Sequence, residues 1–263
     1  MVTIKAIFDY FESIVPTNMK MDFDNPGFLV GDGSKPVYKV LLALDITDEV
    51  VEEAKCFGAD LIVSHHPLFF SIKSASTEDL IGRKIVHMLT NGIGAICLHT
   101  NLDAAVGGVN DALMEVLGIP VEGILELAGA YSDGTPYGHG RFGTISMQSL
   151  EAFLPRVKAA LQCNGLRYIS GGRPVHRVAV CGGSGSSMLP LVAKCGCDTF
   201  ITADVKHNGF MDAREMGINL IDAGHFSTEN VVIPVLERLL REAFPSIETK
   251  ISQVHTQPEQ YYV

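Results

Sequence analysis

The segment that decides the fold is Leu61-Ile-Val-Ser-His-His-Pro67, four uncharged residues followed directly by two histidines. A short run of this kind is typical of a strand buried on both faces in a parallel sheet. On the N-terminal side, Val40–Leu44 predicts another strand and Asp48–Phe57 has helical periodicity. On the C-terminal side we expect a helix near Asp79–Asn91 and a strand over Ala95–Leu98. Because strands and helices alternate, the sequence predicts an α/β fold.

The second half of the chain repeats this layout. Its predicted elements are strands at Val178–Val180, Thr199–Thr202 and Leu220–Ile221, with a helix at Met188–Lys194. Ala54-Lys-Cys-Phe-Gly-Ala-Asp60 before one strand is similar to Ala193-Lys-Cys-Gly-Cys-Asp198 before another. The pattern His99-x-x-x-Asp103 is similarly matched by His225-x-x-x-Glu229. We interpret the similarity between the two halves as an internal duplication, which predicts two similar α/β lobes.

The predicted lobes are residues 1–125 and 126–263, closely packed and with an approximate boundary. Between the repeats, residues 119–176 contain turn-rich stretches and a helical pattern over Leu150–Leu161. This part is expected to form a small sandwich of strands and a helix that joins the lobes.

Composition narrows the classes of function. Of 263 residues, 47% are apolar and 19% charged, which is enough apolar surface for a large core. The net charge of −10 disfavours binding to nucleic acid or to an anionic membrane. Apolar runs such as Val40–Leu44 are shorter than the roughly 18 residues of a spanning helix. With no export signal in the first residues, we expect a cytoplasmic protein.

Histidines follow three of the predicted strands. His65 and His66 follow Leu61–Ser64, His99 follows Ala95–Leu98, and His225 follows the strand around Leu220. Ligands of open α/β sheets gather at the carboxyl ends of strands. Asp103 and Glu229, four residues beyond two of these histidines, add carboxylates that could bridge or cap two ions. Imidazoles with carboxylates suit Zn, Mn, Fe, Co or Ni, so the sequence predicts a transition-metal site.

Three further features allow two interpretations each. His99 could bind a metal, or donate a hydrogen bond that orients a ligand; we favour the second. The two interpretations of His207 are a position near the cavity and a position on the surface. The loop Gly182-Gly-Ser-Gly-Ser-Ser187 could bind phosphate through its amides, although a tight turn is the more common use of such a sequence.

Several motifs resemble the NIF-three-like family of dinuclear-metal-centre proteins. The closest are Ser64–Phe70, His99–Asp103 with Gly107–Asp111, and Asp222–Glu229; Asp24–Gly31, Leu44-Asp45, Tyr137–Gly143 and Cys181–Gly185 fit the same family in order. The resemblance therefore covers nearly the whole chain. Phe23 stands where many members carry tryptophan, and we expect it to matter only for packing.

The resemblance implies a ligand set and an assembly. The family's metal ligands fall on His65, His66, Asp103, His225 and Glu229. The implied fold is two-lobed α/β around a dinuclear site, assembled as a toroidal homohexamer whose sites face an inner cavity. Members are often catalogued as GTP cyclohydrolase I type-two homologues.

The leading functional hypothesis is a hydrolase that depends on two divalent ions per chain. It would act on a small-molecule phosphoester, a nucleotide or a GTP-like ring, with Glu229 or His99 moving the proton. The alternative is a metal-binding scaffold or regulatory ring without catalysis. Two segments, Ile4–Ile14 and Tyr261-Tyr262-Val263, could contact other subunits or simply cap their own lobe.

Overall fold

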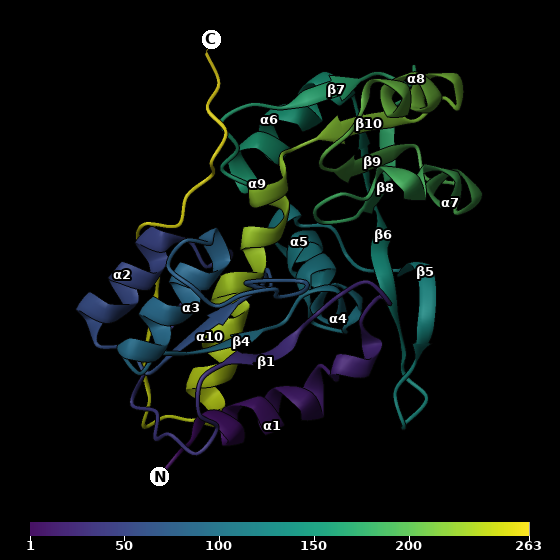
Figure 1. Ribbon diagram of the computed structural model, residues 1–263. Coiled ribbons are helices and arrows are strands. Elements are labelled where there is room, and N and C mark those ends of the chain that lie inside the picture. The colour runs from purple at the N-terminus through teal and green to yellow at the C-terminus, as the bar shows by residue number, and fades with distance from the viewer. Residues whose placement is uncertain (263) are drawn as a thin grey trace. The chain divides into compact units, whose positions relative to one another are not determined.

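The computed structural model describes residues 1–262, and these form two compact units (Figure 1). The first unit contains Met1–Leu102 and Ile233–Thr256; the second contains Asp103–Val232 and the residues from Gln257 on. The predicted boundary at residues 125 and 126 differs from this division, because the chain crosses after Leu102 and returns at Ile233. Val263, part of the predicted tail contact, lies outside the described residues.

The first unit has a five-stranded mixed sheet in the order β1-β4-β3-β2-β11. Its strands are β1 (Gly27–Val30), β2 (Lys39–Ala43), β3 (Leu61–Ser64), β4 (Gly94–Cys97) and β11 (Glu248–Ile251). Strand β1 is antiparallel to β4, and the other neighbours are parallel. The late strand β11, which the sequence analysis did not predict, pairs with β2 and brings the C-terminal segment into this unit.

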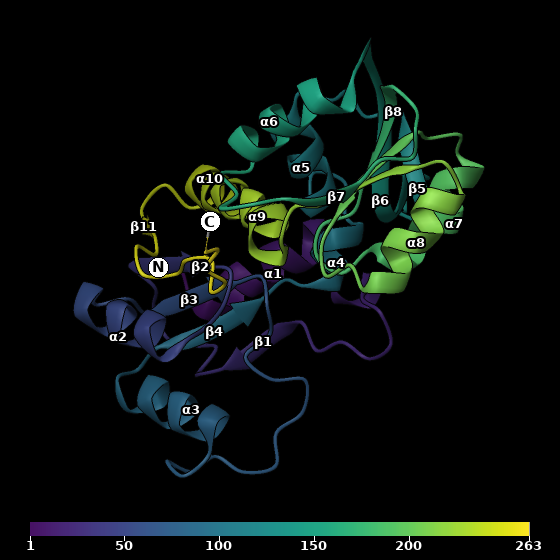
Figure 2. The same ribbon diagram turned by 90° about the horizontal axis from the view of Figure 1, so that it is seen from above.

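Helices cover both faces of the first sheet. They are α1 (Ile4–Ile14), α2 (Asp48–Phe57), α3 (Leu80–Thr90) and α10 (Ile233–Ala243), with a short 3-10 helix η1 (Thr17–Met19). Leu41, Ile62 and Ala95 pack with α2 and α3 in one core cluster. Figure 2 shows α3 on one side of the sheet and α10 on the other. Since alternate strand residues face opposite sides, all four residues of β3 are buried.

Local capping explains why α2 begins where the sequence predicts. The Thr47 side chain accepts a hydrogen bond from the Val50 amide, and Asp48 and Glu49 occupy the first turn. Such a cap and such charges stabilise the amino end of a helix.

Helix α1 buries its apolar face, formed by Ile4, Ile7 and Phe11. The Tyr10 hydroxyl donates to the carbonyl of Leu239 at 3.4 Å, within the same unit. These contacts favour the interpretation that Ile4–Ile14 caps its own lobe.

The second unit has a six-stranded mixed sheet in the order β5-β6-β8-β9-β10-β7. Its strands are β5 (Gly123–Ala130), β6 (Pro136–Gln148), β7 (Arg167–Ile169), β8 (Val175–Val180), β9 (Thr199–Thr202) and β10 (Asn219–Asp222). Strands β8, β9 and β10 are parallel, whereas β5, β6 and β7 pair antiparallel with their neighbours. The middle segment therefore extends this sheet at its two edges instead of forming the separate sandwich that was expected.

Helices also cover both faces of the second sheet (Figure 2). They are α4 (Thr100–Ala104, which begins in the first unit), α5 (Val109–Leu117), α6 (Leu150–Ala160), α7 (Leu189–Lys194), α8 (His207–Glu215) and α9 (His225–Glu229), with 3-10 helices η2 (Ser186–Met188) and η3 (Asn230–Val232). Residues of α5 and α6 pack with Val178 and Ile201. Residues of α7 and α8 pack on the opposite face, with Ala179 and Phe200.

Both units share one order of elements: three parallel strands with a helix after each, and an antiparallel strand beside the last. The helix after the third strand is α4 in one case and α9 in the other. This shared order agrees with the sequence similarity between the two halves of the chain. Within residues 1–262, no helix is long and apolar enough to cross a membrane.

Candidate metal centre

Three histidines of the first unit come together at the carboxyl ends of β3 and β4. The ring centroids of His65 and His66 are 5.1 Å apart, and His99 lies 5.3 Å and 5.5 Å from them. One possible ligand atom from each of the three lies within 4.8 Å of the others. Parallel pairing of β3 with β4 produces this juxtaposition, because both strands end at the same edge of the sheet.

Each of these rings is oriented through its Nδ1 atom. Nδ1 of His65 lies 2.7 Å from the carbonyl oxygen of Leu98, and Nδ1 of His66 lies 2.7 Å from Oδ1 of Asp45. Nδ1 of His99 lies 2.7 Å from Oδ1 of Asp24. Because a carbonyl or carboxylate oxygen only accepts, Nδ1 donates in each case, and Nε2 is the nitrogen suited to a metal.

Asp24 is a buried anchor for His99. Its carboxylate also accepts hydrogen bonds from the Thr100 amide at 3.0 Å and the Thr100 hydroxyl at 2.5 Å. Burial by itself would raise the pKa of Asp24, but the hydrogen bonds from His99 and Thr100 outweigh it and hold the pKa well below its usual range. Asp24 is therefore an ionised acceptor that fixes the His99 ring.

The second unit places a histidine and a carboxylate on one turn of α9. Nε2 of His225 lies 2.9 Å from Oε2 of Glu229, and Nδ1 lies 2.8 Å from Oδ2 of Asp204. Burial lowers the pKa of His225, but Glu229 and Asp204 outweigh it and raise the pKa to about 9. His225 and Glu229 are both side chains that can bind metal, so a cation could replace the proton that they share.

Asp204 has a left-handed backbone, with φ of +54°. The residues on either side are fixed: Ala203 N donates to Gly183 O at 2.9 Å, and Val205 N donates to Asp222 Oδ2 at 3.0 Å. Non-glycine residues in this region are often maintained at functional sites. Here the conformation supports the carboxylate that orients His225.

The glycine-rich loop after β8 is a tight turn that leaves room for Glu229. Its amides donate to side chains of the same unit: Gly182 N to Asn110 Oδ1 and Gly183 N to Thr228 Oγ1, both at 3.0 Å, and Gly185 N to Thr202 Oγ1 at 2.9 Å. These bonds favour the turn over the phosphate-binding interpretation. A Cβ atom on Gly183 would overlap Glu229 Oε1.

Asp103 lies in the same unit as Glu229, and a network of side chains holds its segment in place. Asn110 Nδ2 donates to the Asp103 carbonyl at 3.0 Å. One carboxylate oxygen of Asp103 lies within 4.8 Å of one of Glu229. Burial raises the pKa of the Cys181 thiol, and the charges of these two carboxylates raise it further. The unit thus brings together Asp103, His225 and Glu229 around the glycine-rich loop.

Arg141 fixes the ends of α4 and α5 to β6. The guanidinium is only 2% exposed and makes a two-point contact with Asp111, at 2.9 and 3.1 Å. It also donates to the carbonyls of Gly138, Gly140 and Ala105. All five N–H groups of the side chain are therefore engaged.

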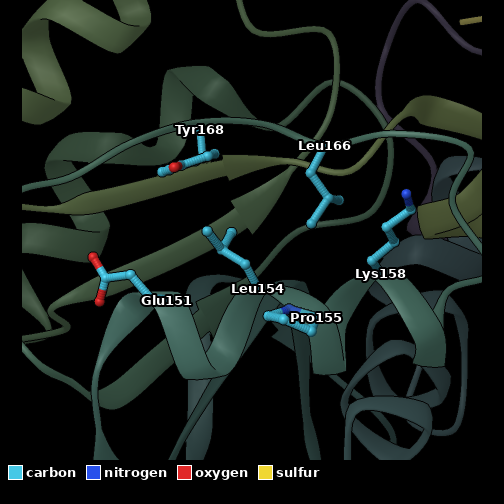
Figure 3. Close-up of a pocket in the computed structure, with 6 residues that line it drawn as sticks. All are labelled: Glu151, Leu154, Pro155, Lys158, Leu166 and Tyr168. Carbon is cyan, nitrogen blue, oxygen red and sulfur yellow. The ribbon is translucent and has the colours of Figure 1, made fainter. Parts of the chain in front are cut away.

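A pocket of about 390 Å³ lies elsewhere in the second unit, between α6 and β7 (Figure 3). Its lining residues are Glu151, Leu154, Pro155, Lys158, Leu166 and Tyr168. Figure 3 shows Glu151 and Lys158 at opposite ends. None of the predicted metal ligands lines this pocket.

The sequence predicts the histidines of the site but not the carboxylates that orient them. Asp24 and Asp45 were noticed only as parts of motifs, and Asp204 received no role. Asp24 and His99 are 75 residues apart, so no local spacing could have linked them. His207 is exposed at the start of α8.

Comparisons with known proteins place the chain in a family. It matches the model of Duf34/NIF3 (NGG1p interacting factor 3) over residues 2–258. A GTP cyclohydrolase 1 type 2 homolog of Clostridium perfringens is 36% identical over 262 residues, covering 98% of this chain and 99% of that protein. A protein of the same description from Clostridium acetobutylicum is 35% identical over 243 residues, covering 91% and 90%.

Solved structures agree with the sequence comparisons. A hypothetical protein of Staphylococcus aureus superposes with a TM-score of 0.89 at 29% identity, covering 99% of each chain. A Bacillus cereus protein related to NIF3 gives a TM-score of 0.89 at 25% identity, covering 100% of this chain and 99% of that one. Two mixed sheets of this arrangement define an α/β protein of NIF3-like fold. The chain belongs to the Duf34/NIF3 family, which confirms the resemblance found in the sequence.

Proposed function

We propose that the protein is a metal-dependent hydrolase whose His65, His66, Asp103, His225 and Glu229 hold two divalent transition-metal ions. The observation that carries the proposal is the group of three imidazoles, each held through Nδ1 by an oxygen acceptor. Nitrogen and carboxylate donors of this kind fit Zn, Mn, Fe, Co or Ni better than Mg or Ca. The proposed substrates are small phosphoesters, nucleotides or molecules with a GTP-like ring.

Bound ions of this kind activate water and stabilise negative charge during hydrolysis. The chain's own residues orient the reactants and move protons. Asp45 holds the ring of His66, and Asp204 holds the ring of His225. His99, held by Asp24, is available as an acid or base beside His65 and His66. Glu229 is the second candidate for proton transfer, since it contacts His225 Nε2.

The names of the relatives support a GTP-like substrate, because several are described as GTP cyclohydrolase 1 type 2 homologs. We also propose that the chain assembles as a homohexameric ring in the cytoplasm. Light scattering would test the ring, with an expected mass near six times 28.4 kDa. A stable monomer with full metal content would refute the assembly and leave the proposed site standing.

The test of the hydrolase is a screen of phosphoesters, nucleotides and GTP with protein reconstituted in Zn or Mn. His65→Ala should abolish hydrolysis and lower the metal content. His87→Ala is a matched control in the same unit, because His87 is a partly exposed histidine of α3 whose Nε2 lies 3.4 Å from Oε2 of Glu52. Full metal binding without turnover of any substrate would favour the non-catalytic scaffold.

A further inference from the structure

Two aromatic rings stand exposed beside the histidine cluster of the first unit. Phe23 is 65% exposed and Phe70 is 55% exposed. Their ring centroids are 6.2 Å apart with the planes tilted by 50°. Phe70 in turn lies 5.9 Å from the ring of His99, edge to face. Phe23, Phe70 and His99 thus form a continuous row of rings that we call the aromatic row.

The exposure of Phe23 overturns the expectation that it serves only packing. A solvent-exposed phenylalanine alone needs no explanation, but an aromatic pair that extends to a candidate site does. Most of each ring faces water in the chain as it stands, so covering the rings with another apolar surface would be favourable.

Hydrogen bonds fix the segment that carries Phe23 on both sides of that residue, and one of them also reaches the residue before Phe70. Asn25 Nδ2 donates to the carbonyl of Phe69 at 2.9 Å, which ties the residues next to Phe23 and Phe70 together. Met21 N donates to Thr100 Oγ1 at 3.0 Å, on the other side of Phe23. These bonds position the backbone from which Phe23 and Phe70 project beside His99.

We propose that Phe23 and Phe70 form a stacking wall for a planar heteroaromatic ring, such as a nucleobase, that belongs to the substrate. The inference rests on the proposed hydrolase function and narrows its substrate class. Aromatic faces stack on any base, because every base has a π-face. Because the row ends at His99, a ring stacked on Phe70 would keep its substituents close to the three imidazoles.

The test compares two probes that differ only in the ring system. Protein reconstituted with Zn is titrated with GMP and with ribose 5-phosphate by calorimetry, for wild type, Phe70→Leu and Phe23→Leu. Leucine retains apolar volume but has no aromatic face. We expect the wild type to prefer GMP, and each variant to bind GMP about fivefold to tenfold more weakly while ribose 5-phosphate binding and metal content stay unchanged.

Tyr38→Leu is the matched control, since Tyr38 is an aromatic residue of the same unit, is 59% exposed and directly precedes the amino end of β2. A second readout uses Phe23→Trp. The chain contains no tryptophan, so this variant carries a single tryptophan, at the wall, that can be excited selectively. GMP should quench its emission and ribose 5-phosphate should not.

Three binding results would refute the proposal that Phe23 and Phe70 form a stacking wall. They are a wild type without preference for GMP, variants that bind GMP as tightly as wild type, and an equal loss for both probes. A change in light-scattering mass caused by Phe70→Leu would assign the rings to a subunit contact instead. The outcome is separable from the hydrolase proposal: ring-dependent binding without turnover refutes only hydrolysis, whereas turnover with unaltered GMP binding refutes only the wall.

Discussion

Replacing Gly183 with alanine should damage the candidate site through a single added carbon. Gly183 has φ of +60° and lies against the carboxylate of Glu229. The new Cβ would overlap Oε1 of Glu229 and would lie 3.0 Å from its Cδ and 3.3 Å from Cε1 of His225. Carbon atoms in contact are usually about 3.5–4.0 Å apart, so the carboxylate must move by roughly 0.5 Å or more.

The expected magnitude has two parts. An alanine in the left-handed region costs about 1–2 kcal/mol. Glu229 is only 4% exposed, so moving its carboxylate away from His225 costs about a further 1–3 kcal/mol. The Gly183→Ala variant should therefore lose about 2–5 kcal/mol of unfolding free energy in the metal-free protein. It should also retain less metal.

Gly196→Ala isolates the contact with Glu229 from the backbone effect. Gly196 has φ of +70°, in the same unit, but a Cβ there meets nothing within 4 Å. This control should lose only about 1–2 kcal/mol and keep its full metal content. The assays are urea denaturation of metal-free protein and elemental analysis after reconstitution. Equal losses of stability and equal metal content in the two variants would refute the reasoning.

Three other perturbations test the network around the site. Arg141→Met should lower the unfolding free energy by about 3–5 kcal/mol in urea denaturation, because it leaves Asp111 without its buried partner. Arg177→Met removes a more exposed pair with Glu122 and should lower it by about 1 kcal/mol or less. Similar losses in the two variants would contradict this expectation. The pKa of Asp24 is lowered in the folded chain, so its contribution to stability is present above about pH 4 and is lost on acidification. Asp24→Asn should therefore flatten the acid limb of stability against pH more than Asp32→Asn, because Asp32 is exposed and hydrogen bonds from Ser34 lower its pKa less. Because the pKa of His225 is raised to about 9, its protonation should stabilise the metal-free chain below about pH 6.5, and this stabilisation should be lost as the pH rises to about 9. Glu229→Gln should make the unfolding free energy fall less steeply over this pH range, and an unchanged dependence on pH would disprove the coupling.

Local sequence was sufficient to predict much of each unit. The apolar run Leu61–Ser64 and the helix Asp48–Phe57 have the predicted bounds. Both depend on interactions within a few residues: side-chain alternation in a strand, and the Thr47 cap with helical periodicity in a helix. The placement of histidines after strands likewise followed from the general rule that ligands gather at carboxyl ends.

The boundary of the units could not be predicted in this way. Strand β11 pairs with β2 across some 200 residues of sequence, and its segment carries no signal that names its partner. Glu248–Ile251 has a polar pattern with no buried residue, which explains why the periodicity of apolar residues did not reveal it as a strand.

The sequence by itself determined the α/β class, the family and the side chains able to bind metal, because residue type and short-range spacing encode strand burial, helix caps and donor chemistry. Only the tertiary structure decided which oxygen orients each imidazole, as in the pairing of Asp24 with His99. It alone also showed that Phe23 faces solvent and that Gly183 clears space for Glu229. These are relations between segments distant in the chain, and they arise from packing and strand pairing, which local periodicity does not specify.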